Sequence, residues 1–198
     1  RETTLASFIH SFNTSTPGVP MYIFGTQFSH AHPHLMLGFE SLFDLFRNTS
    51  AWEVPLMPKG SAQPGLETNA QFFLGPKGSG APVHYHMAAV NYLAYGRKLW
   101  RLKPPNISSY DVTPAAIYFN RTDESALTCI QEQGDVLIVP SQWEHATLNV
   151  EVLYRCEVTY SQTLNLCIDR VVGALLTFSQ ASVGVAFEIT SVFDLKEE

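Results

Sequence analysis

Two histidines one residue apart, His84 and His86 in the segment APVHYHMAAV, have the clearest potential for chemistry in this sequence. In a β-strand, residues i and i+2 point to the same face, so both imidazoles project together while Tyr85 faces away. A metal needs a further ligand, and His145 offers one after the apolar run and Pro-bearing turn of GDVLIVPSQWEHATLN. The trio predicts a metal site. The alternative is three buried histidines satisfied by backbone hydrogen bonds.

A second group of histidines, His30, His32 and His34, lies in the segment SHAHPHL. Their spacing is also compatible with a metal-binding tract. However, Pro33 interrupts the group and no partner motif follows it. We interpret the segment as a loop with incidental histidines.

The elements that must position the first trio are short strands. From Asn69 onward, short apolar or alternating runs are separated by Gly, Pro and Asn, which is typical of an antiparallel β-sandwich or barrel. The predicted strands cover residues 70–74, 82–86, 90–95, 98–102, 127–130, 135–139, 145–150 and 152–160.

Helices are expected on both flanks of this β-rich region. Residues 3–12 place apolar side chains at helical spacing after a Thr that can cap, which predicts a short amphipathic helix. Residues 164–180 again show helical spacing, and we expect a helix that packs outside the sheet or against a partner. The whole chain, 1–198, is expected to form one domain in which 164–198 is a helical C-terminal extension.

Length and charge limit the classes of function. A chain of 198 residues with 45% hydrophobic content can bury a sizeable core. The net charge of −6 is spread along the sequence without a basic patch that could follow phosphates, which argues against nucleic acid as a partner. No apolar run reaches the roughly 18 residues that a membrane span needs.

Glycosylation sequons and cysteines favour the secretory pathway. The sequence contains four N-x-Ser/Thr sequons, at Asn13, Asn48, Asn106 and Asn120, more than chance would give. Cys129 and Cys156 lie in separate apolar segments that could face each other as a disulfide, which leaves one cysteine free or paired outside the chain. The tail DLKEE is one Leu short of a retention-type K-x-E-L ending, although a charged terminus is its ordinary interpretation.

Two segments together resemble a known family. GSGAPVHYHMAAVNYLAYGRKLWRLKPP followed by QGDVLIVPSQWEHATLNVE is similar to the JmjC branch of the cupin superfamily, over roughly residues 70–160. The resemblance implies a mainly β fold, the double-stranded β-helix or jelly roll, with flanking helices. It also implies that the first strands of the family's domain precede Arg1, and it favours the lumen of the endoplasmic reticulum.

The resemblance also implies a metal site with one changed ligand. Active family members hold iron(II) with His-x-Asp/Glu and a distal His. The first and distal histidines match His84 and His145, whereas His86 occupies the position of the carboxylate. Three neutral imidazoles leave the charge of the metal uncompensated, so iron(II), zinc and no metal all stay open. Glu144 is not expected to substitute, because the neighbour of His145 on a strand points the other way.

The positions for 2-oxoglutarate are better kept. The resemblance implies that Asn91, Lys98 and Asn149 hold this cosubstrate. A buried Lys98 ammonium would need an anionic partner, and a carboxylate of oxoglutarate is the one implied. The alternative is a surface lysine in a hairpin next to Gly96.

Three functions follow from these observations. The first is an iron(II)- and 2-oxoglutarate-dependent hydroxylase acting on a protein substrate, with metal ligands His84, His86 and His145. The second is a catalytically inactive fold that binds a protein partner, favoured by the missing carboxylate. The third is a three-histidine cupin chemistry that needs no oxoglutarate. A homodimer through residues 164–182 is also expected.

Overall fold

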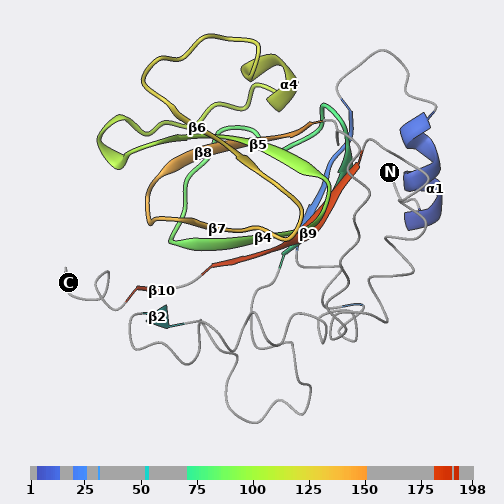
Figure 1. Cartoon of the computed structure of the whole chain (residues 1–198). Helices are drawn as coiled ribbons and strands as arrows, with labels where there is room; N and C mark the ends of the chain where they lie inside the picture. Colours follow the sequence, from blue (N-terminus) through green and yellow to red (C-terminus); the bar gives the residue numbers. More distant parts are fainter. Residues whose placement is uncertain are drawn as a thin grey trace.

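The computed structural model describes residues 4–13, 20–25, 31, 52–53, 71–150, 181–188 and 190–191. Two antiparallel sheets form its body and face each other (Figure 1). The larger sheet has the strand order β1-β3-β9-β4-β7, the smaller has the order β6-β5-β8, and a short pair joins β10 to β2. The bounds of the strands are β1 Ile23–Gly25, β2 Trp52–Glu53, β3 Gln71–Pro76, β4 Ala89–Tyr95, β5 Arg97–Lys103, β6 Leu127–Gln131, β7 Val136–Val139, β8 Glu144–Val150, β9 Ala181–Glu188 and β10 Thr190–Ser191.

The chain winds back and forth between the two sheets. β4 lies in the larger sheet, β5 and β6 in the smaller, β7 returns to the larger and β8 to the smaller. Gly96 makes the tight crossing from β4 to β5 with a φ of 101°, a conformation that favours glycine. This winding is that of a double-stranded β-helix, so the predicted fold class is confirmed.

Most predicted strands agree with the structure to within two residues. The exception among the described residues is 82–86, which forms only two isolated bridges, Val83 with Asp111 and His84 with His145. Residues 152–160 lie outside the described residues. Apolar residues of the confirmed strands form much of the core, and Phe73, Val90 and Leu93 of the larger sheet are fully buried.

The predicted N-terminal helix is confirmed as α1, Leu5–His10, followed by the 3-10 turn η1, Ser11–Asn13. Thr4 caps it, because its hydroxyl accepts a hydrogen bond from the Ser7 backbone N–H at 3.1 Å. Phe8 and Ile9 are buried in one cluster with Phe72, Leu74, Tyr95, Ala181 and Val183 of the larger sheet. The helix therefore covers the outer face of that sheet. In the part of the chain that the structure describes, no helix has the length and hydropathy of a membrane span.

The expectation of a helical extension over 164–198 is wrong for residues 181–188. These residues form β9, which pairs with β3 on one side and β4 on the other. The sequence ASVGVAFE carries β-branched Val183 and Val185 and no charge before its last residue, as a strand buried on both faces requires. The helical spacing upstream concealed this signal. Residues 164–180 lie outside the described residues.

The expected dimer surface over 164–182 also changes. Ala181 is 1% exposed and Ser182 is fully buried, because both lie inside the larger sheet. These two residues are therefore not part of a dimer surface.

A substitution at Gly184 tests whether β9 lies between β3 and β4. A Cβ at this position would collide with the carbonyl oxygen of Tyr92 on β4 and the ring of Phe73 on β3. We expect Gly184→Ala to lower the free energy of unfolding by about 1–3 kcal/mol, the usual cost of overpacking. Urea denaturation measures this difference.

The matched control is Gly25→Ala in β1, where an added Cβ meets nothing within 4 Å. It should change the free energy of unfolding by less than about 0.5 kcal/mol. Equal effects of the two substitutions would contradict the central position of β9.

Candidate metal and anion site

A pocket lies between the two sheets and holds about 460 Å³ of space, its open mouth included. Both sheets contribute to its wall: β4 supplies Asn91, β5 supplies Lys98 and Trp100, and β8 supplies His145 and Thr147. His84 and His86 line it from the segment before β4. The three histidines predicted to form a site therefore meet in one pocket.

Backbone pairing brings the histidines together. The His84 N–H donates to the His145 carbonyl at 3.1 Å, and the His145 N–H donates back to the His84 carbonyl at 2.8 Å. His86 follows two residues later on the same face. The ring of His145 lies 4.2 Å from that of His84 and 4.7 Å from that of His86, between centroids. One ring nitrogen from each lies within 4.8 Å of those of the others.

Each imidazole is oriented by a backbone carbonyl. The Nδ1 atom of His84 lies 2.7 Å from the Pro82 oxygen, that of His86 lies 2.6 Å from the Met87 oxygen, and that of His145 lies 3.0 Å from the Trp143 oxygen. A carbonyl oxygen only accepts, so each Nδ1 must carry the proton. Each Nε2 is then left with a lone pair. Backbone hydrogen bonds thus satisfy only half of each ring, and the other half is available to a metal.

Burial favours the neutral form of His84 and His145. Desolvation, and then the positive charge that His84 would carry, lower the pKa of His145 from 6.5 to about 3. Desolvation also lowers the pKa of His84, opposed by the hydrogen bond to Pro82. Neutral imidazole is the form that binds metals.

The donor set fits a divalent transition metal. Three Nε2 atoms that carry lone pairs instead of protons attract a cation. Imidazole is a suitable ligand for iron, zinc, copper and nickel. Among the described residues, no carboxylate belongs to this group. Glu144 is buried on the other side of β8, where its carboxylate accepts from Ser109, so the prediction that it does not replace the missing ligand is confirmed.

Lys98 is the second polar feature of the pocket. It is 1% exposed, which makes the surface-hairpin interpretation wrong. Its ammonium lies 3.5 Å from the centroid of the Phe73 ring and donates to the Tyr22 hydroxyl at 2.9 Å. Within the described ranges it has no carboxylate partner. Desolvation therefore lowers the pKa of Lys98 well below its ordinary value.

Tyr22 and Thr147 were not predicted as site residues. Burial raises the pKa of Tyr22, and a hydrogen bond with the Thr147 side chain opposes this shift. Both line the pocket beside Lys98. Tyr22 lies 76 residues before Lys98 in an unremarkable apolar run, so no local signal marks it.

Of the two asparagines predicted to hold a cosubstrate, one lines the pocket and the other does not. Asn91 lines the pocket, is 6% exposed and has a buried Oδ1 atom without a hydrogen-bond partner among the described residues. Asn149 does not line it. Its Nδ2 donates to the Gly75 carbonyl at 3.1 Å and to Ser79 Oγ at 3.0 Å, so it fixes the turn after β3.

The other predicted residues lie away from the pocket. Asn106 and Asn120 are exposed in the connection between β5 and β6, and Asn13 ends η1. Cys129 lies half-buried on β6, where burial raises the pKa of its thiol. Asn48, Cys156 and the group His30, His32 and His34 lie outside the described residues, so the disulfide stays a prediction.

The chain is similar to several characterised proteins, although no family model matches it. JmjC domain-containing protein 8 from Rattus norvegicus is 26% identical over 178 residues, 76% of this chain and 64% of the relative. Lysine-specific demethylase JMJ21 from Arabidopsis thaliana is 28% identical over 193 residues, 84% of this chain and 20% of the relative. The 2-oxoglutarate and iron-dependent oxygenase JMJD4 from Danio rerio is 32% identical over 98 residues, 40% of this chain and 23% of the relative.

Among solved structures, the ribosomal oxygenase YcfD from Escherichia coli aligns over 91% of this chain and 35% of its own, with 12% identity and a TM-score of 0.46. The chain spans no more than 64% of the length of the three curated relatives named above.

We expect the metal-free chain to lose stability as the pH falls, at pH values where ordinary carboxylates are still ionised. The folded pKa of His145 is about 3 against 6.5 ordinarily, so the unfolded state binds the proton first as the pH falls. The free energy of unfolding should therefore decrease as the pH drops below 6.5. The contribution of His145 to this slope should approach about 1.4 kcal/mol per pH unit. Urea denaturation of chelator-treated protein at about pH 7, 6 and 5 measures the slope.

His145→Gln should flatten this slope, because glutamine does not titrate. The exposed His10 on α1 offers the control, and His10→Gln should leave the slope as in the wild type. An unchanged slope in His145→Gln would show that its imidazole is not held neutral.

Proposed function

This chain belongs to the JmjC branch of the cupin superfamily, and on that premise we propose that it is an iron(II)- and 2-oxoglutarate-dependent oxygenase that hydroxylates a protein substrate. The observation that carries the proposal is a pair of unsatisfied groups in one pocket. Three imidazole nitrogens lie within 4.8 Å of one another there, and among the described residues the buried Lys98 ammonium has no carboxylate partner. Iron(II) and a dicarboxylic acid would satisfy both.

The residues divide between the two ligands. His84, His86 and His145 would hold the metal through Nε2, each oriented by its Nδ1 hydrogen bond. Lys98 and Tyr22 would hold a carboxylate of the cosubstrate, where the desolvated ammonium gains most from an opposite charge. Asn91 contributes a polar side chain to the same pocket from β4.

The metal, when bound, supplies activation of molecular oxygen, and the protein supplies the surroundings. Trp100, Val139 and Ala186 line the pocket and keep water from its walls. Trp100 is itself fixed, because its indole N–H donates to Gln131 Oε1 at 2.9 Å. A rigid, apolar wall of this kind protects a reactive centre from side reactions.

The names of two relatives support the proposal, the first for a lysine-bearing substrate and the second for the cofactors. One is called a lysine-specific demethylase and another a 2-oxoglutarate and iron-dependent oxygenase. The pocket is open at its mouth, and Met87, the residue after His86, is exposed, which gives a peptide segment access.

A binding module without catalysis is the second candidate function. It is favoured by His86, which stands where active family members have a carboxylate. Without that negative charge the bound metal keeps its full double charge, and its redox chemistry changes. In this alternative the chain holds a metal, zinc included, and acts through a protein partner.

Ligand binding and turnover separate these functions. Anaerobic titration with iron(II) and then 2-oxoglutarate should show both binding, and oxygen should then release succinate. His145→Ala should abolish metal binding. Lys98→Met should keep metal binding but raise the Kd of 2-oxoglutarate at least about tenfold, since a charge-assisted hydrogen bond contributes about 1.5–3 kcal/mol.

Arg97→Met is the matched control, because Arg97 precedes Lys98 on β5 and pairs with Glu132 outside the pocket at 2.7 Å. It should leave both ligands unaffected. Metal binding without any succinate release favours the binding module. Metal and oxygen uptake without a need for oxoglutarate would indicate another three-histidine chemistry, and no metal uptake would refute the proposal.

We further propose the lumen of the endoplasmic reticulum as the location, supported by the sequons. Asn106 and Asn120 are exposed, as acceptors of a bulky glycan must be. When the chain is expressed in the secretory pathway, Asn106→Gln and Asn120→Gln should each remove the mass of one glycan in an electrophoretic or mass-spectrometric assay. Asn91→Gln, which alters no sequon, is the control. Unchanged masses in both variants would contradict the proposal.

A further inference from the structure

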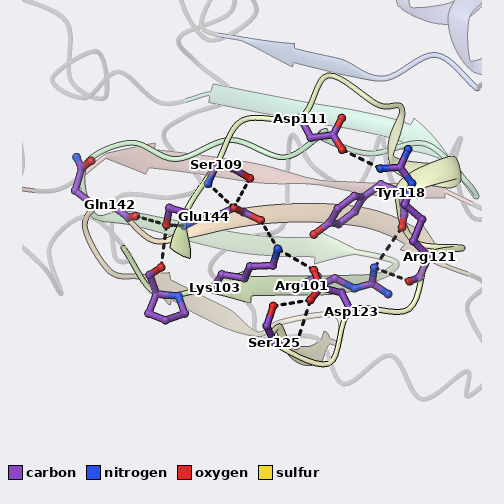
Figure 2. A network of polar contacts seen from close by, with 12 residues as sticks. Arg101, Lys103, Ser109, Asp111, Tyr118, Arg121, Asp123, Ser125, Gln142 and Glu144 are labelled. Atoms are coloured by element: carbon purple, nitrogen blue, oxygen red, sulfur yellow. Dashed lines mark hydrogen bonds and ion pairs between the residues drawn. The ribbon is translucent and has the colours of Figure 1, made fainter. Parts of the chain in front are cut away.

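The long connection between β5 and β6 passes beside the strand that carries His145 (Figures 1 and 2). It contains the 3-10 turn η3, Pro105–Ile107, and the short helix α4, Ala115–Tyr118. Between them lie residues 108–111, which we name the strap. The strap contacts both segments that supply histidines to the pocket.

Glu144 ties the strap to β8. This residue precedes His145 and is 2% exposed. Its carboxylate accepts from the backbone N–H of Ser109 and from Ser109 Oγ at 2.9 Å, and Glu144 N donates to Ser108 Oγ at 3.2 Å. Lys103 Nζ lies 3.4 Å from the same carboxylate. A buried carboxylate needs such partners, so it holds the strap firmly.

The other end of the strap holds the segment around His84. The Tyr110 hydroxyl donates to the Tyr85 carbonyl at 2.9 Å, and the two rings lie 4.4 Å apart. Asp111 N donates to the Val83 carbonyl at 3.3 Å. These two bonds fix the backbone on both sides of His84.

Gln142 connects the strap to the third histidine. Its N–H donates to the His86 carbonyl at 2.8 Å, and its own carbonyl accepts from Ser108 Oγ at 3.1 Å. Its φ of 62° is uncommon for a residue with a side chain, so these contacts select the turn. The hydrogen bonds therefore form a closed circuit through the backbone beside all three histidines.

Ion pairs anchor this circuit to the rest of the connection (Figure 2). Lys103 also binds Asp123 at 2.8 Å, and Arg121 binds Asp111 at 3.0 Å. Arg101 donates to the carbonyls of Tyr118 and Arg121 at the end of α4. The strap is thus held from β5, from β8 and from α4.

We propose that Glu144 is a positioning residue for the three-histidine site, acting through the strap. It touches neither the pocket nor the ring nitrogens. It keeps the histidine segments at a fixed separation in the metal-free protein, so that metal binding costs little rearrangement. This inference rests on the proposed function, because it requires that the site binds a metal.

Cobalt(II) titration tests the inference in the full chain. Glu144→Gln should raise the Kd for cobalt(II) about tenfold, as is typical when a residue that supports metal ligands is changed. Tyr110→Phe, which loses one exposed hydroxyl, should raise it severalfold. The double variant should fall short of the product of the two effects, because both act through the strap.

The control is Glu132→Gln, which removes an exposed carboxylate from an ion pair with Arg97. It should leave the cobalt affinity unchanged. The visible absorption band of bound cobalt, which reports ligand geometry, should shift in Glu144→Gln and stay in place in Glu132→Gln.

The outcomes distinguish this inference from the proposed function. If Glu144 serves only the stability of the fold, Glu144→Gln lowers Tm but leaves the cobalt Kd and the absorption band of the folded protein unchanged, which overturns the inference. Should Glu144→Gln not fold, wild-type cobalt affinity in Tyr110→Phe overturns it equally. A wild-type chain that takes up no cobalt overturns the proposed metal function and the positioning role with it.

Discussion

The backbone bridge between His84 and His145 is the interaction on which the site depends. Its two hydrogen bonds, 3.1 and 2.8 Å long, join segments that are distant in sequence. They set the separation of two imidazoles directly and that of the third through the two-residue period of the extended chain. β5 holds β8 in place from the other side, so the smaller sheet fixes the distal histidine before any ligand arrives.

Charge organises the rest of the pocket. In the described part of the chain, its polar wall consists of three imidazoles, two amides, two hydroxyls, the Trp100 indole and one ammonium, without a carboxylate. A metal cation and the Lys98 ammonium repel each other in a medium of low dielectric constant. An anion that contacts both removes this repulsion. By itself, a lysine at a fully buried position lowers the stability of the fold, because burial removes its ammonium from water.

The sequence predicted the histidine trio because each signal was local: the alternation of a strand and a Pro-bearing turn. It also predicted the positions of most strands, since their boundaries are marked by Gly and Pro. It could not predict Tyr22, Gln142 or the role of Glu144, because these depend on contacts between distant segments. The hydrogen bond from Asn149 on β8 to the Gly75 carbonyl is a further contact between distant segments that the sequence does not reveal. The strand β9 was missed because apolar residues at helical spacing precede it.

The central position of β9 has a consequence for the order in which the molecule is made. The three histidines and Lys98 are synthesised before Ala181. The larger sheet is nevertheless incomplete until β9 pairs with β3 on one side and with β4 on the other. Ala186 of this strand also completes the wall of the pocket. During translation the histidines and Lys98 therefore lie in an incomplete β-structure, in which β3 and β4 each have an unpaired edge. Pairings of this long range form slowly and leave such edges exposed to other chains, so a chaperone has most to protect in that interval.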